Sequence, residues 1–131
     1  MPFAIGQPAA QVPTVAPVTE KHYETVTTPE ALDAWIAKIA AAPLTAIDTE
    51  TDSLDGMKAR IVGISLAVTV GEAAYIPLGH SYADAPEQLS MTEVLGELKP
   101  WLEDEAAPKL GQNIKYDTHV FANAGIAVRG Y

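Results

Sequence analysis

Cysteine is absent from this 131-residue sequence, which excludes disulfide bonds, zinc knuckles, iron–sulfur clusters and thiol catalysis. Any metal ion would therefore be held by oxygen atoms or by one of only three histidines. No apolar run approaches the roughly 20 residues of a membrane-spanning helix. A secretory signal begins with basic residues, but no lysine or arginine precedes Lys21, so the sequence does not predict such a signal. These absences predict a soluble cytoplasmic protein without a membrane partner.

Basic residues are also scarce, because 8 lysines and arginines stand against 17 acidic residues and give a net charge of −9. This charge opposes broad, sequence-independent binding of nucleic acid through its phosphates. An acidic domain can still process nucleic acid where divalent cations bridge its carboxylates to substrate phosphates. A role in nucleic-acid processing therefore requires that several carboxylates lie close together in the fold, where they can bind divalent cations.

Length and composition suit one domain, since hydrophobic residues make up 48% of the chain and charged residues 19%. Residues 1–20 differ from the rest, with no charged side chain before Glu20 and with prolines at positions 2, 8, 13 and 17. Such a segment favours extended backbone. It predicts a linker over 1–20, tethering the domain to an upstream part of a longer protein, and a folded domain over 21–131.

The folded part alternates between strand and helix patterns, which predicts an α/β domain around a mixed sheet. Residues 44–50 begin apolar on both faces, as a central strand covered on both sides would. With 60–68 and 73–78 they predict an antiparallel meander. Further strands are expected at 22–27 and 109–112.

Helix signals are clear at three places. Thr28 can cap a helix that begins at Pro29, and Ser90 can cap a second that continues toward Leu102 past a break or kink at Pro100. A third helix is expected at 114–124, with a glycine after its end. The inward positions of these elements predict a core of Leu32, Trp35, Ile36, Ile39, Ile47, Ile64, Leu66, Leu95, Leu98 and Phe121.

Three acidic residues are the candidates for chemistry. Asp48 and Glu50 are two positions apart on one strand, so their side chains leave the same face near its carboxyl end, where ligand sites of α/β sheets lie. Asp117 falls on the inward face of the third helix, where a carboxylate needs a metal ion or hydrogen bonds. By themselves, the first two also fit a solvated strand end, and Asp117 fits a favourable acid near a helix start.

The surrounding motifs resemble a known family. They are AIDTETDSL at 46–54, IVGISLAV at 61–68, AYIPLGH at 74–80 and GQNIKYD at 111–117. Together they resemble the 3′-5′ proofreading exonuclease domain of bacterial DNA polymerase I, the family A polymerases. That domain belongs to the DEDD exonucleases, which have a ribonuclease H-like fold and four metal-binding acids. The resemblance extends from about Tyr23 to Tyr131.

The resemblance implies an activity in DNA replication and repair, the hydrolysis of the 3′-terminal phosphodiester of DNA with two divalent ions. The ions would be magnesium or manganese, or zinc at one of the two sites. Asp48 would bind both ions, Glu50 the first and Asp117 the second. The implied partners are a single-stranded or frayed 3′ end of DNA and a polymerase domain in the same parent chain.

The same resemblance implies a set of substrate-binding residues. Thr51 and Leu54 would touch the terminal nucleotide, and Gln112, Asn113 and Tyr116 would lie along the single strand. Ordinary packing is the alternative for Leu54 and Tyr116. Helix capping is the alternative for Gln112 and Asn113.

One departure limits the resemblance. The third motif of the family is a tyrosine followed four residues later by the fourth acid, but Tyr131 is the only tyrosine after Tyr116 and no aspartate follows Asp117. The sequence is therefore expected to hold the N-terminal part of the domain, incomplete at its C-terminus, and to be weakly active or inactive alone. Two alternatives remain: an RNA exonuclease of the ribonuclease D type, and a non-catalytic DNA-binding or docking domain of the same fold.

Overall fold

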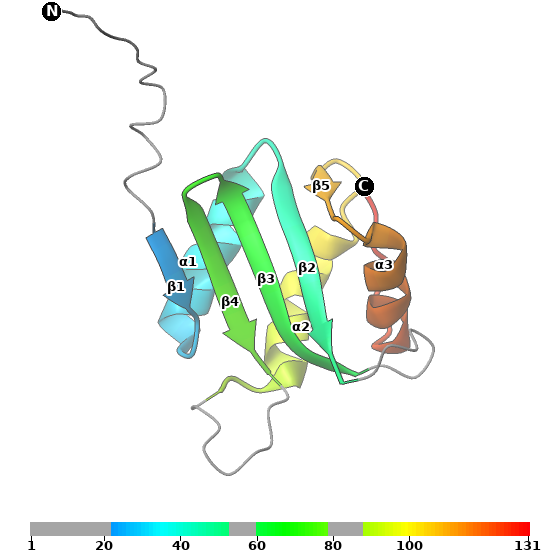
Figure 1. Cartoon of the computed structure of the whole chain (residues 1–131), viewed down its shortest axis with the longest axis horizontal. Coiled ribbons are helices and arrows are strands. Elements are labelled where there is room, and N and C mark those ends of the chain that lie inside the picture. Colours follow the sequence, from blue (N-terminus) through cyan, green and yellow to red (C-terminus); the bar gives the residue numbers. More distant parts are fainter. Residues whose placement is uncertain (1–21, 53–59, 79–87) are drawn as a thin grey trace, which may run out of the picture.

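A computed structural model of the chain describes residues 22–52, 60–78 and 88–131. The predicted linker at 1–20 and the candidate residue Leu54 lie outside these described residues. The described part forms an α/β domain in which two helices lie behind a five-stranded sheet in the view of Figure 1. Within that part, no helix has the length and apolar character needed to cross a membrane.

The elements follow one another in the order that the patterns predict. The strands are β1 (His22–Thr25), β2 (Thr45–Thr51), β3 (Ile61–Thr69), β4 (Glu72–Pro77) and β5 (Lys109–Leu110). The helices are α1 (Pro29–Ala41), α2 (Met91–Leu102) and α3 (Ile114–Asn123).

The sheet is mixed, with the strand order β1-β4-β3-β2-β5. Strands β2, β3 and β4 form the predicted antiparallel meander, while β1 pairs in parallel with β4 and β5 in parallel with β2. The prediction that 44–50 is the central strand is wrong within the described sheet. There, β3 is the middle strand, because β1 extends the sheet beyond β4, and β2 lies between β3 and β5.

Coverage of β2 also differs from the prediction, because only one of its faces is well buried. Thr45 and Ile47 are buried on the face that joins the core, whereas Asp48 and Glu50 on the opposite face are exposed. Leu44, expected to start the strand, lies just outside it and is 45% exposed. The open face of the sheet is the face that carries the two carboxylates.

Local signals at the helix ends account for most of the boundaries. The Thr28 side chain accepts a hydrogen bond from the backbone of Ala31, and the Ser90 side chain accepts one from Glu93. Gly125, with a φ of 84°, follows the C-cap of α3 as predicted. These caps satisfy backbone groups that a helix leaves unpaired at its ends.

Pro100 does not break α2, which continues to Leu102. Trp101 and Leu102, the two residues after the proline, are 7% and 0% exposed. Their burial offsets the hydrogen bond that a proline removes from a helix. The expected break at Pro100 is therefore replaced by a helix whose last turn is part of the core.

The core matches the predicted set with one exception. Nine of the ten predicted residues are buried, and Ile36 is only partly buried at the margin of the core. The core side chains come from α1, α2 and α3, from β2, β3 and β4, and from the neighbouring residues Val26, Leu78, Ile126 and Val128. The largest fully buried side chains are Trp35 and Phe121, followed by Leu32, Ile39, Ile64, Leu66, Ile76, Leu98 and Leu102.

Candidate active site

Asp48 and Glu50 stand on the open face of the sheet, near the carboxyl end of β2. The antiparallel register pairs Asp48 with Ser65 and Glu50 with Gly63 of β3. The register shifts just after Glu50, since Thr51 pairs with Ile61, so the pairing of β2 and β3 is irregular at this end. Both carboxylates are exposed and therefore accessible to a ligand from solvent.

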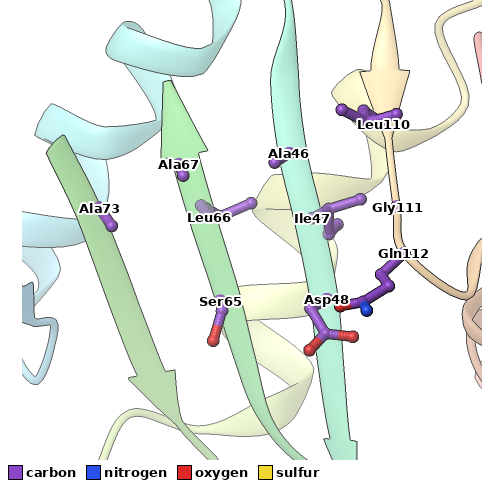
Figure 2. A pocket seen from close by; sticks show the side chains of 10 residues that line it. All are labelled: Ala46, Ile47, Asp48, Ser65, Leu66, Ala67, Ala73, Leu110, Gly111 and Gln112. Atoms are coloured by element: carbon purple, nitrogen blue, oxygen red, sulfur yellow. The ribbon is translucent and has the colours of Figure 1, made fainter. Parts of the chain in front are cut away.

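A hollow of about 410 Å³ lies beside Asp48 on this face. Figure 2 shows the Asp48 carboxylate, the Ser65 hydroxyl and the Gln112 side chain among the residues that line it. Small residues make the hollow possible, since alanines occupy positions 46, 67 and 73 and glycine occupies position 111. The predicted substrate residue Gln112 therefore lines the same hollow as the predicted metal ligand Asp48.

Asp117 approaches β2 from α3. Its side chain is only 1% exposed, and its Oδ1 accepts a hydrogen bond of 2.6 Å from the Thr49 hydroxyl. Its other oxygen, Oδ2, is buried and has no hydrogen-bond partner among the described residues. A buried carboxylate oxygen without a partner is costly and marks a place where a cation or a donor is expected.

Burial raises the pKa of Asp117 above its ordinary value of 3.8, and the hydrogen bond from Thr49 opposes this shift. The negative charge of Asp48 also raises the pKa of Asp117. Burial is the largest cause of the raised pKa of Asp117, larger than the repulsion from the Asp48 carboxylate.

The three predicted carboxylates do not form a compact cluster in this structure. Across residues 22–52, 60–78 and 88–131, no three acidic or histidine side chains are close enough together to hold a metal ion. Strand alternation explains part of this arrangement, because Asp117 contacts Thr49, whose side chain leaves β2 on the side opposite Asp48 and Glu50. The structure brings Asp48 and Asp117 within electrostatic range and directs Glu50 toward Tyr75 of β4.

The predicted substrate residues have different surroundings. The Thr51 hydroxyl and the Tyr116 phenol are hydrogen-bonded at 2.6 Å, which joins β2 to the first turn of α3. Gln112 and Asn113 are exposed, and Asn113 is the N-cap residue of α3 without a side-chain capping bond. The capping alternative is therefore wrong for the Asn113 side chain, although the residue does occupy the cap position.

Three residues that contact the candidate site are missing from the sequence prediction. Thr49 holds Asp117, Tyr75 contacts Glu50, and Gly63 lies opposite Glu50 on β3. The alternation of DTET at 48–51 already places Thr49 and Thr51 away from the two acids, which was a usable signal. Tyr75 and Gly63 had no such local signal, since their relation to Glu50 depends on the register of three strands.

The donor set fits divalent cations. Carboxylate oxygens are the preferred protein ligands of magnesium and manganese. Asp48 offers an exposed carboxylate, and Asp117 offers a buried oxygen that lacks a partner among the residues described. These observations describe an α/β domain in which Asp48 and Asp117 offer oxygen atoms of the kind that hard divalent cations prefer.

The comparison with known families is specific. Residues 23–131 match the 3′-5′ exonuclease family, and the chain belongs to this family. DNA polymerase I of Pseudomonas aeruginosa is 51% identical over 113 residues, which are 85% of this chain and 12% of that protein. DNA polymerase I of Rhizobium leguminosarum is 36% identical over 147 residues, covering 99% of this chain and 14% of that protein. The chain thus spans about an eighth of the length of these relatives.

Solved structures support the ribonuclease H-like α/β fold. The POL domain of Pol1 from M. smegmatis, in complex with DNA primer-template and dNTP, has a TM-score of 0.60 at 20% identity and covers 81% of this chain and 17% of its own. RNase D of Trypanosoma brucei in complex with RNA U12 has a TM-score of 0.69 at 17% identity and covers 89% of this chain and 39% of its own. At these identities, the likeness concerns the fold alone.

Proposed function

We propose that residues 21–131 are part of the 3′-5′ proofreading exonuclease domain of a DNA polymerase I, and that residues 1–20 link it to the rest of a longer cytoplasmic bacterial protein. Two divalent ions would be bound by Asp48, Glu50 and Asp117. The observation that carries the proposal is the buried Oδ2 of Asp117, which lacks a partner among the described residues and lies within electrostatic range of the exposed Asp48. Relatives that are DNA polymerases I support the substrate class.

The chain's own residues would position the ions and the substrate. When bound, such ions activate water near neutral pH and stabilise the leaving 3′ oxygen. Thr49 fixes the Asp117 carboxylate so that Oδ2 is the oxygen left for a ligand. The net charge of −9 repels phosphates, so the cations would also neutralise the charge between the protein and the nucleic acid.

The DNA strand would pass over the open face at the end of β2. The hollow beside Asp48 provides room next to the proposed ligands, and Gln112 lies at its edge with a side-chain amide for hydrogen bonds. Tyr116 is hydrogen-bonded to Thr51 on the other side of β2, and its partly exposed ring would offer a stacking surface to a base at the end of that strand. Asn113 is exposed at the start of α3 and would contact the same strand.

The test is degradation of 5′-labelled single-stranded DNA and of RNA with the same sequence, with magnesium or manganese and with a chelator as control. The 131-residue chain should be weakly active or inactive, and a longer protein that contains the third motif should be active. Asp48→Ala in the longer protein should abolish DNA degradation. Undiminished activity of Asp48→Ala would contradict the site, and a preference for RNA would favour the ribonuclease D alternative.

A further inference from the structure

A tyrosine from β4 crosses the sheet to reach Glu50. The register aligns Glu50 with Gly63 on β3, and Gly63 with Pro77 on β4. Tyr75 lies two positions before Pro77 and so leaves the same face of the sheet. Its hydroxyl donates a hydrogen bond to Oε1 of Glu50, two strands away from its own backbone.

Gly63 is what allows this crossing. A Cβ atom at this position would overlap the Tyr75 hydroxyl and ring, and would come within 2.6 Å of Cε1. The tyrosine ring therefore lies directly over the bare backbone of β3. Any residue other than glycine would push the ring away from Glu50.

The hydrogen bond from Tyr75 helps to orient the Glu50 carboxylate. Glu50 is exposed, and its long side chain has several rotamers in water. A hydrogen bond to Oε1 favours the rotamers that keep this oxygen next to the Tyr75 hydroxyl. Carboxylates that ligate metals are commonly held by such outer hydrogen bonds, which orient the ligand before the ion arrives.

We propose that Tyr75 is a positioning residue for Glu50. Gly63, which has no side chain, leaves the space that the Tyr75 ring occupies between β4 and Glu50. The inference rests on the proposed function, because Glu50 is a metal ligand only under that proposal. It adds two residues to the site, neither of which touches the ion or the substrate.

Direct Mn²⁺ binding to the 131-residue chain tests this inference without relying on activity. Tyr75→Phe keeps the ring and removes only the hydroxyl, and it should weaken Mn²⁺ binding by roughly 10-fold or more. Tyr23→Phe is the matched control, because Tyr23 is a tyrosine of the edge strand β1 and 64% exposed. Its affinity for Mn²⁺ should equal that of the wild-type chain, and the melting temperatures of all three proteins should be compared.

Gly63→Ala provides a second, independent route to the same effect. Gly63→Ala should weaken Mn²⁺ binding by displacing the Tyr75 ring. Both substitutions act through the same hydrogen bond, so their effects should not add. The double variant with Tyr75→Phe should therefore lose much less Mn²⁺ affinity than the two single fold-losses multiplied together. If Gly63→Ala fails to fold, Tyr75→Phe decides the matter alone.

Asp48→Ala separates the failure of this inference from the failure of the proposed function. If Asp48→Ala weakens Mn²⁺ binding and Tyr75→Phe binds as tightly as Tyr23→Phe, the positioning role is wrong and the metal site stands. If the wild-type chain shows no Mn²⁺ binding that depends on Asp48, the proposed function fails in this chain and the inference fails with it.

Discussion

The hydroxyl of Thr49 donates a 2.6 Å hydrogen bond to Oδ1 of Asp117. This bond joins the inward side of β2 to α3 and, with the bond between Thr51 and Tyr116, attaches the helix to the strand that carries Asp48 and Glu50. It also decides which oxygen of Asp117 remains for a ligand. A strand residue placed between two acids thus holds the third acid of the candidate site.

Replacing Thr49 with valine should destabilise the fold. The hydroxyl is lost while the shape is kept, and a buried carboxylate loses its hydrogen-bond donor, which costs about 1.5–3 kcal/mol when one partner is charged. The free energy of unfolding, measured by urea denaturation, checks this expectation. Thr49→Ser should recover most of the loss, and equal destabilisation by valine and serine would contradict the role of the hydroxyl.

The raised pKa of Asp117 predicts a specific pH dependence in the absence of metal. The folded state binds the proton of the Asp117 carboxyl more tightly than the unfolded state does, so protonation of Asp117 favours folding at low pH. This contribution to the free energy of unfolding is lost as the pH rises from about 3.8 through the pKa of Asp117 in the folded state. Asp117→Asn cannot ionise, so its stability relative to wild type should increase as pH rises from about 4 to 7. Urea denaturation at several pH values in a chelator measures the difference. A difference that does not change with pH would show that Asp117 titrates normally.

Divalent cations should offset the loss of stability that the buried, ionised Asp117 carboxylate causes. An ion that binds only the folded state stabilises it by about 2.7 kcal/mol when its concentration is about 100 times the dissociation constant. Mn²⁺ should therefore raise the melting temperature of the wild-type chain. The same addition should have little effect on Asp48→Ala, and an equal rise in both proteins would place the bound ion elsewhere.

The end of α2 should contribute strongly to stability despite Pro100. Leu102 is fully buried two residues after the proline, and truncating a buried leucine to alanine costs about 2–5 kcal/mol. Leu102→Ala should lower the free energy of unfolding by this amount. Val70→Ala is a suitable control, since Val70 is 81% exposed and its truncation should change stability by less than about 0.5 kcal/mol. Similar effects of the two substitutions would show that the last turn is not part of the core.

Much of this protein is determined by short-range patterns in the sequence. The period of two places Asp48 and Glu50 on one face of a strand, and Thr28 and Ser90 start helices because their side chains bond to backbone groups three residues away. The local patterns also predict the order in which strands and helices follow one another. These features depend on neighbours within one turn or one strand, so the sequence alone determines them.

Tertiary structure decided the rest. That β3 is the middle strand of the described sheet depends on the pairing of β1 with β4, which are far apart in the chain. The continuation of α2 past Pro100 depends on a core that buries the residues after it. The contacts of Tyr75 with Glu50 and of Thr49 with Asp117 join residues 25 and 68 positions apart. Strand register and helix packing bring such residues together, and a local sequence pattern does not predict contacts between residues this far apart in the chain.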